Sequence, residues 1–357
     1  MDKISFPYRS SSHLILLHVI AESGAWEKHG LDVNYNFQIT KKEAHRAVPL
    51  GEIEFVGGNH ISAYGHRARG DTWVYLGQTV NKNETKLAVR RESGISSVSD
   101  LRGRIVGTRG NHPGLNDWLF LKRRGLDIDH DDVQLVSEIH GEVSSEAAEQ
   151  FLEGPTPKKK RKPVWQWVRD GDVDAALLTT PANLFAEEAG LKLIDLEPMP
   201  MIYFTTISSS LGFVKKNPDI VDRFLKAMIE GVHYFKTHEE QSIRIIQEKC
   251  EKSGKMNLAQ ATITYQSIAK ILEPNLYPSM AAIANVYEEA KRSDKDAEKV
   301  NPMELWDLHH LRQIDDSGFI RDLYKNSNSA SVGKVDLDRI AEKKKHDADM
   351  VAAFKRA

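Results

Sequence analysis

A short pattern that occurs twice constrains the fold of this chain more than any other feature. The two copies are Gly51–His60 and Gly171–Pro181. In each, a glycine ends a polar helix, an acidic residue follows, and an apolar strand runs out into small or polar residues. A parallel strand buried on both faces has such a continuous apolar run, and ligands bind beyond the carboxyl ends of such strands. The repeat therefore predicts two similar α/β lobes, each presenting one strand end to a shared cleft.

Composition indicates a globular protein with two domains and excludes several classes of partner. The 357 residues are 40% hydrophobic and 28% charged, which is ordinary for a folded protein. The net charge of −2 gives no basic surface for nucleic acid. No apolar run approaches the roughly 18 residues that span a bilayer, so we predict no membrane insertion. A single cysteine, Cys250, excludes an internal disulfide and a cysteine-based metal cluster.

The N-terminus has no basic segment followed by an apolar one, because Ile4–Tyr8 already has the pattern of a first strand. We therefore expect a cytoplasmic protein. A removed export signal replaced by an initiator methionine would give the same sequence, so export stays open as the alternative.

Three junctions of helix, glycine, leucine and strand support alternating β and α units. They lie at Gly30, Gly125 and Gly190, where each glycine stands directly after a helix. Two strands, Lys86–Arg90 and Met201–Ile207, are expected to cross between the lobes. The predicted domains are a discontinuous lobe 1 (residues 1–84 and 206–325), lobe 2 (85–205), and a polar linker with a charged helix (326–357). That last helix is either solvated or a contact to a second copy in a homodimer.

Two polar loops, one in each lobe, favour an anionic ligand. The first carries Arg9, Ser11 and Ser12 just before a helix, and either serine has the place of an N-cap. The second runs from Thr108 to Pro113 before another helix. Helix N-termini present free N–H groups and a positive dipole end, which suit an anion. We therefore count Arg109, Asn111 and His112 of the second loop among the ligand-binding candidates.

The exit of the first repeated strand supplies further candidates. Gly57 and Gly58 let other groups approach the backbone closely, and Asn59 and His60 follow. The next short helix carries Tyr64 and Arg67, with Arg67 spaced to share one helical face with His60. In the second lobe the corresponding strand exits supply His140, Thr179 and Thr180.

The fourteen histidines do not form a recognisable metal motif. No two of them combine in a compact spacing with a carboxylate, so we predict no metal site and no cofactor. A histidine in the cleft is better explained as a hydrogen-bonding or acid–base group. His45, on the helix before the first repeated strand, and His60 are the candidates for catalysis.

An insertion at Val143–Lys162 interrupts the second lobe. It contains a turn signal followed by the basic run Lys158–Lys162. The run matches a nuclear-localisation pattern, but a solvated loop explains it better. An insertion beside a cleft can also cover the ligand.

Four motifs together resemble the nitrate/sulfonate/thiamine-precursor type of ABC-transporter substrate-binding protein. They are Trp26–Val33, Ser99–Arg104, Gly171–Ala175 and Asn217–Phe224, and the similarity extends over about residues 1–325. The resemblance implies a two-lobed, periplasmic-binding-protein-like (type II) α/β fold with two crossing strands and a helical C-terminal extension. It also implies a ligand between the lobes. The cysteine-rich stretch of the thiamine-pyrimidine synthases is absent.

Some relatives of that fold are cytoplasmic lyases, among them a hydroxybiphenyl sulfinate desulfinase and dihydroxyphthalate decarboxylases. Alignment with the desulfinase places its nucleophilic cysteine at Ser11 and its catalytic histidine at His45. Its Arg-x-Gly-Gly motif falls at Phe55–Gly58. The histidine and the glycines are therefore kept, while the thiol and the arginine are not. The resemblance thus argues against desulfination that depends on a thiol.

Two functions follow from these observations. The first is a lyase, a decarboxylase of an aromatic or other conjugated acid. It needs a carboxylate clamp, which Arg9, Arg67 or Arg109 could supply, and a proton donor, which His45 or His60 could supply. The second is the substrate-binding component of an importer, whose cleft only closes on its ligand and whose further partner is an ABC permease.

Overall fold

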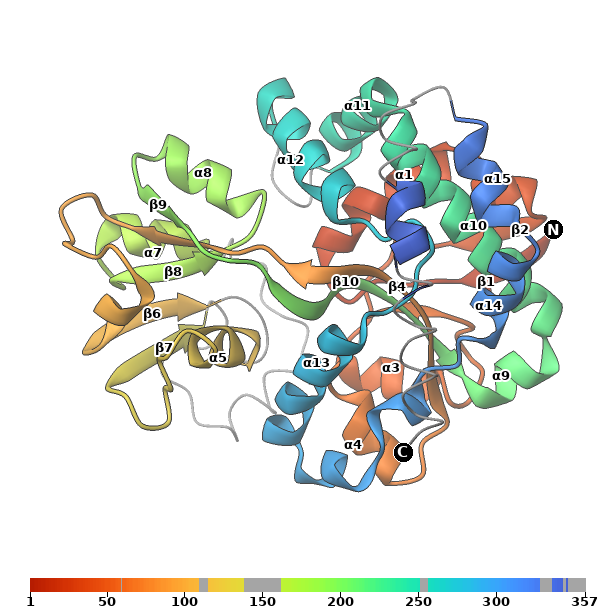
Figure 1. Ribbon diagram of the computed structural model, residues 1–357, viewed down its shortest axis with the longest axis horizontal. Helices are drawn as coiled ribbons and strands as arrows, with labels where there is room; N and C mark the ends of the chain where they lie inside the picture. The colour runs from red at the N-terminus through yellow and green to blue at the C-terminus, as the bar shows by residue number, and fades with distance from the viewer. Residues whose placement is uncertain are drawn as a thin grey trace. The chain divides into compact units, whose positions relative to one another are not determined.

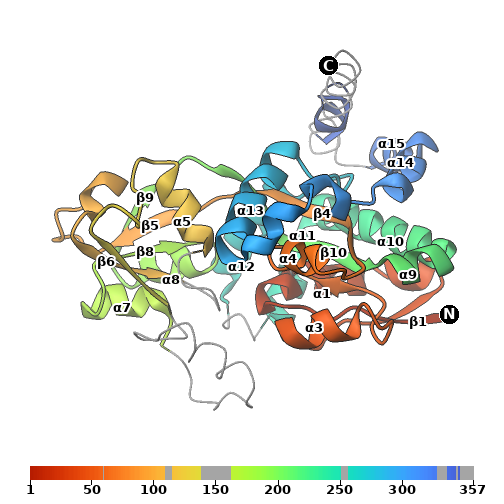
Figure 2. The same cartoon turned by 90° about the horizontal axis from the view of Figure 1, so that it is seen from below.

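The described residues of the computed structural model form two units of α/β structure (Figures 1 and 2). They are residues 1–58, 60–108, 115–137, 162–250, 256–327 and 336–342, with Lys345. Unit 1 comprises Met1–Asn81, Ile202–Ile283 and Asp296–Ala357, and unit 2 comprises Lys82–Met201 and Ala284–Lys295. Among the described residues, no helix is both long enough and apolar enough to cross a membrane.

Unit 1 begins with alternating strands and helices and continues as a run of helices. Its first part has β1 (Asp2–Ser5), η1 (Ser11–His13), α1 (Leu14–Glu22), α2 (Ala25–Lys28), β2 (Leu31–Asn34), α3 (Lys41–Ala47), β3 (Val56–Gly57), α4 (Ala63–Ala68) and β4 (Trp73–Asn83). After β10 (Met199–Ser210) follow α9 (Leu211–Lys216), α10 (Pro218–Thr237), α11 (Glu239–Lys249), α12 (Leu258–Ile271), η5 (Pro302–Leu305), α14 (His309–Asp316) and α15 (Phe319–Lys325). Between α12 and η5, α13 (Met280–Ser293) passes into unit 2 at Ala284, and η4 (Lys295–Lys299) returns to unit 1 at Asp296. β1 pairs with β2 in parallel, and β3, β10 and β4 form a second sheet in that order.

Helices α1 and α10 pack against each other in unit 1 (Figure 1). They approach at Gly231, where an added Cβ would lie 2.6 Å from Cγ1 of Ile20. A side chain at this position would clash, so the distance between the two helices depends on the glycine. Nearby, Phe224 of α10 stacks on Phe55 at 4.0 Å between ring centroids. These contacts hold the segment that leads into β3.

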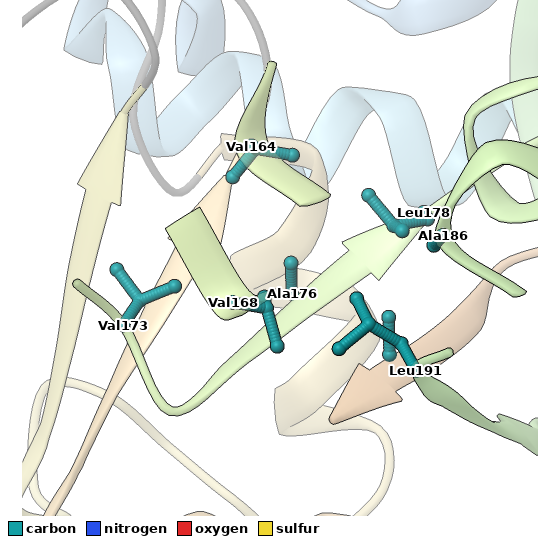
Figure 3. Close-up of a cluster of buried hydrophobic side chains, with 8 residues drawn as sticks. Val164, Val168, Val173, Ala176, Leu178, Ala186 and Leu191 are labelled. Atoms are coloured by element: carbon teal, nitrogen blue, oxygen red, sulfur yellow. The ribbon is translucent and has the colours of Figure 1, made fainter. Parts of the chain in front are cut away.

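Unit 2 contains one five-stranded sheet in the order β7-β6-β8-β5-β9. Its elements are β5 (Lys86–Val89), η2 (Val98–Leu101), β6 (Arg104–Thr108), α5 (Leu115–Lys122), β7 (Val133–Ser137), α7 (Val164–Asp170), β8 (Ala175–Leu178), α8 (Ala182–Glu188) and β9 (Lys192–Asp195). α7 and α8 cover one face of this sheet, and α5 lies on the other (Figure 2). Figure 3 shows the apolar cluster under α7, in which Val164 and Val168 face Ala176 and Leu178 of β8.

The pattern found twice in the sequence is a structural repeat. Gly51 and Gly171 both have left-handed backbones, with φ of 72° and 82°. The strand after each lies between one antiparallel and one parallel neighbour. β3 pairs antiparallel with β10, and its Gly57 also bridges Tyr8 in parallel. β8 pairs antiparallel with β5 and parallel with β6. Each copy therefore has the predicted parallel pairing on one side only, because an antiparallel strand of the same unit pairs with its other side.

Two strands, β4 and β10, run through the boundaries between the units in the sequence. Only β10 corresponds to a predicted crossing strand. β4 runs through the boundary at residues 81/82, and β10 runs through it at 201/202. The predicted crossing segment Lys86–Arg90 is instead β5, inside the sheet of unit 2. Residues 84 and 85 separate β4 from β5, and the Thr85 hydroxyl donates to the Asn83 side chain at 2.8 Å. Residues 284–295, expected in lobe 1, belong to unit 2.

The C-terminal helical segment at residues 336–342 is attached to unit 1 through a buried ion pair. Asp336 is 2% exposed and lies 3.2 Å from Nζ of Lys236 on α10. Lys236 also donates to the carbonyls of Ala269 and Leu272, at 2.7 and 3.2 Å. Arg339 reaches Glu273 at 3.0 Å. This part of the predicted tail therefore packs on the protein's own core, whereas the sequence led us to expect a solvated helix or one that contacts a second copy.

Candidate functional site

The candidate site consists of three side chains from the first part of unit 1. They are Arg9, which follows β1, His13, which ends η1, and His60, which follows β3. The chain after β1 runs beside β3, and the Arg9 N–H donates to the Gly57 carbonyl at 3.1 Å. The guanidinium of Arg9 donates to the Ile39 carbonyl. η1 then turns His13 back toward the same place, and His60 follows the exit of β3. A cation and two imidazoles therefore come together from segments 50 residues apart, and we call this group the Arg9 cluster.

The backbone of Gly57 and Gly58 lies directly against the side chains of Arg9 and His13. A Cβ at Gly57 would lie 3.3 Å from His13 Nδ1. At Gly58, where φ is 125°, it would lie 2.7 Å from Cγ of Arg9. The sequence predicted that these glycines permit a close approach, and the groups that approach are side chains of the same chain. The glycines thus position Arg9 and His13.

Both histidines of the Arg9 cluster are neutral at physiological pH. Burial, then His60 and Arg9, lower the pKa of His13 to about 3. Burial, then Arg9, lower the pKa of His60 to about 4. The Nδ1 atom of each ring is buried and has no hydrogen-bond partner among the described residues. A neutral imidazole carries one N–H donor, so the cluster offers a cation and two uncommitted polar groups.

Arg9 itself stays charged at physiological pH. Burial lowers the pKa of its guanidinium to about 10, and the Glu43 carboxylate opposes this. A partly desolvated cation binds an anion more strongly than an exposed one, because less water screens the attraction. The arrangement is suited to a small anion.

Phe204 is a strained residue beside the Arg9 cluster. It lies within β10 but has φ of 66°, a conformation rare for a non-glycine residue. Its ring centroid is 5.7 Å from that of His13. Strain of this kind persists only where surrounding structure fixes it, and it concentrates at functional sites. Neither His13 nor Phe204 was among the predicted site residues. His13 directly follows the serine loop, which was a usable signal.

His45 lies outside the Arg9 cluster, in a second group of side chains. Its Nε2 is 2.8 Å from the Ser62 hydroxyl, and its ring stacks on His66 with centroids 3.6 Å apart. Nδ1 atoms of His45 and His66 each lie 3.7 Å from the same carboxylate oxygen of Asp71. The three residues come from α3, α4 and the turn after α4, so no compact sequence motif announces them.

Several predicted contacts have other roles in the structure. Tyr64 is fully buried, and its hydroxyl is 3.4 Å from Trp306 Nε1, so it is a core residue and not a ligand contact. Ser11 and Ser12 lie in η1, whose start has no side-chain cap, so the predicted capping role is wrong. α4 begins at Ala63, so His60 precedes the helix and does not share a helical face with Arg67. Arg67 donates to the Asp71 carbonyl at 3.4 Å.

The remaining predicted residues belong to unit 2 or lie outside the described residues. Thr179 and Thr180 follow β8 directly and are half-buried. The candidates that lie outside the described residues are Asn59, Arg109, Asn111, His112 and His140. The insertion at 143–162 lies outside them too, except for Lys162.

A family model described as "NMT1/THI5 like" matches residues 12–148. No curated protein sequence gives a significant match. The matched segment contains His13 and His60 of the Arg9 cluster but not Arg9.

Solved structures with the same fold include binding proteins and an enzyme. A Bordetella bronchiseptica RB50 protein is 18% identical, with a TM-score of 0.64, and covers 89% of this chain and 98% of its own. The periplasmic aliphatic sulphonate binding protein SsuA from Escherichia coli is 15% identical, with a TM-score of 0.58, and covers 85% and 99%. A mutant of DSZB in complex with biphenyl-2-sulfinic acid is 17% identical, with a TM-score of 0.59, and covers 88% and 99%; DSZB is a desulfurization enzyme.

These similarities confirm the predicted resemblance to substrate-binding proteins and to their lyase relatives, and they establish the periplasmic-binding-protein-like fold. Fold alone does not fix chemistry, which has to be argued from the site.

Proposed function

We propose that this protein binds a small organic anion at the Arg9 cluster and acts on it as a cytoplasmic, decarboxylase-like lyase. The observation that carries the proposal is the placement of a half-buried guanidinium beside two neutral imidazoles whose Nδ1 atoms have no partner among the described residues. Arg9 would hold a carboxylate, and His13 would orient it. The similarity to SsuA and to DSZB supports an anionic organic ligand at this fold.

His60 is the proton donor in this proposal. A bound carboxylate beside His60 raises the pKa of the imidazole, because the anion stabilises the charged ring. Binding of the substrate therefore causes His60 to take up a proton from solvent. The bond between the ring carbon and the carboxylate carbon breaks, its electron pair stays on the ring carbon, and carbon dioxide leaves. His60 then gives its proton to that carbon and takes another from solvent.

The chain has no thiol at this site that could attack a sulfinate. Its one cysteine, Cys250, is buried at the end of α11, and burial raises the pKa of the thiol to about 12. A thiol in this state is not nucleophilic. Ser11 has the position of the thiol in the resemblance to the desulfinase. Decarboxylation, which needs no nucleophile, is the lyase chemistry that these residues support.

A substrate-binding component of an ABC importer is the second candidate. The similarity to sulfonate-binding proteins favours it, because such a protein needs the anion contacts of Arg9 but no proton transfer. Genes for a permease and an ATPase beside the gene for this protein would also favour import.

One experiment separates the two functions. The purified protein is incubated with a panel of aromatic carboxylates and sulfinates, and the products are identified by mass spectrometry. We expect loss of carbon dioxide from a carboxylate in the wild type, no turnover in H60Q, and unchanged turnover in H130Q, which alters an exposed histidine of unit 2. Binding without turnover, abolished in R9Q, would establish the importer component instead. Binding that survives in R9Q would overturn the site itself.

A further inference from the structure

The second group of side chains, His45, His66 and Asp71, has the donor set and the spacing of a metal site. Its possible ligand atoms all lie within 4.8 Å of one another. Nδ1 atoms of both imidazoles face the same Asp71 Oδ2 at 3.7 Å. In a tetrahedral zinc site with bonds of about 2.0–2.1 Å, neighbouring ligand atoms are about 3.4 Å apart. Coordination would therefore bring the outermost ligand atoms closer by up to about 1.4 Å and tilt the two stacked rings so that their lone pairs converge on the ion.

The polar atoms of this group lack the partners that they would need without an ion. His45 is only 9% exposed, and its Nδ1 has no hydrogen-bond partner among the described residues. The same holds for Asp71 Oδ1. A distance of 3.7 Å is too long for a hydrogen bond. Buried polar atoms are normally paired, and an unpaired one in a native structure calls for an explanation such as an ion.

The surroundings of His45 orient it as a ligand. Its Nε2 is 2.8 Å from Ser62 Oγ, so a proton on Nε2 leaves the Nδ1 lone pair directed at the carboxylate. Metal-bound histidines commonly make such a hydrogen bond through the nitrogen that is not bound to the metal. The Trp73 ring lies 4.8 Å from that of His45 and gives the site an apolar wall.

The charges near the group also permit a cation. The Asp71 carboxylate lies beside both imidazoles and supplies a negative charge that offsets the charge of an ion. The positive charge of Arg69 is offset by Asp296 at 2.9 Å. The side chain of His66 is 36% exposed, which gives an ion access to the site from solvent.

We propose that His45, His66 and Asp71 bind a divalent transition-metal ion with the preferences of Zn²⁺, through the two Nδ1 atoms and Oδ2. Two histidines and one carboxylate form the usual protein ligand set of several catalytic zinc sites, which keep one open position. This site is separate from the Arg9 cluster and does not rest on the proposed function. Ser62, two residues after His60, connects the two groups along the chain.

Calorimetric titration of the full, chelator-treated protein with Zn²⁺ tests the proposal. We expect one Zn²⁺ per chain in the wild type and a raised Tm when Zn²⁺ is present. S62A should weaken binding by about tenfold, because it removes the group that orients His45, and H66Q and D71N should weaken it more. H309Q is the matched control, since His309 also has a ring neighbour, His310, and a carboxylate partner, Asp307. It should bind as the wild type does.

Co²⁺ gives a second readout, because its visible absorption depends on coordination number and geometry. We expect a four-coordinate spectrum in the wild type that H66Q loses. Circular dichroism of each variant separates loss of a ligand from loss of folding, and S62A and H66Q decide the question where D71N does not fold. The proposal is overturned if the wild type binds no Zn²⁺, or if both H66Q and D71N bind it as tightly as the wild type.

Discussion

The backbone of Gly58 and the side chain of Arg9 touch so closely that a Cβ on Gly58 would lie 2.7 Å from Cγ and 2.9 Å from Cβ of Arg9. These atoms lie at the root of the arginine side chain, where no rotation at its far end relieves the contact. The orientation of the guanidinium in the Arg9 cluster therefore depends on the absence of a side chain at position 58.

Replacing Gly58 by alanine should displace Arg9. We expect G58A to lower the free energy of unfolding by about 2–4 kcal/mol, because it combines backbone strain at φ of 125° with the clash. Anion affinity should fall as well. G94A is the control, since Gly94 has φ of 72° but no atom within 4 Å. It should cost about 1 kcal/mol and leave affinity unchanged. Equal effects of the two variants, measured by urea unfolding, would contradict this account.

Anion binding at the Arg9 cluster should take up a proton. The pKa of His60 is about 4 in the free protein, and a bound anion raises it. Affinity should therefore be constant at high pH and increase by up to about tenfold per unit as pH falls from 8 to 5. Calorimetry in buffers of different ionisation enthalpy measures the proton directly. H60Q should remove the pH dependence while H130Q keeps it. A wild-type affinity independent of pH would refute the role of His60.

Glu289 on α13 should lower the free energy of unfolding increasingly as the pH rises. It is fully buried, and burial, then Asp117, raise its pKa from an ordinary 4.5 to about 9. Between these values the unfolded chain loses the proton and the folded chain keeps it, so stability falls from pH 4.5 toward 9.

The variant E289Q should therefore raise Tm relative to the wild type more at pH 8 than at pH 5. We expect a gain of at least about 1 kcal/mol at pH 8, since one pKa unit corresponds to about 1.4 kcal/mol. The neighbouring Glu288 is 44% exposed and pairs with Lys291. E288Q should show no such difference between the two pH values in calorimetric scans.

The buried pair of Lys236 and Asp336 should be sensitive to loss of one partner. K236M removes the nearer cation of the buried Asp336 carboxylate and leaves only Arg339, at 3.7 Å, so we expect a loss of about 3 kcal/mol in the free energy of unfolding. K226M breaks the half-exposed pair of Lys226 and Asp222 on the same helix and should cost less than about 1 kcal/mol. If chemical denaturation gives similar losses for both variants, the pair does not attach the C-terminal segment as described.

The sequence allowed the fold and part of the site to be predicted, for identifiable reasons. The glycines before β3 and β8 end helices through their own backbone conformation, which depends only on neighbouring residues. The repeat could therefore be recognised in the sequence. The identity of the crossing strand depended on the break between β4 and β5 at residues 84 and 85, which leaves little trace in composition. The group of His45, His66 and Asp71 depends on how α3 and α4 pack, which no spacing along the chain encodes.

The contact of α1 with α10 at Gly231 has a consequence for how this protein can change over evolutionary time. Because the methyl of an alanine at 231 would occupy the space of Ile20, the two positions can drift only together. A natural relative with a larger residue at the first position should carry a smaller one at the second. Laboratory evolution that begins from G231A should recover stability through substitutions at Ile20, so this pair would record the helix contact in sequence data alone.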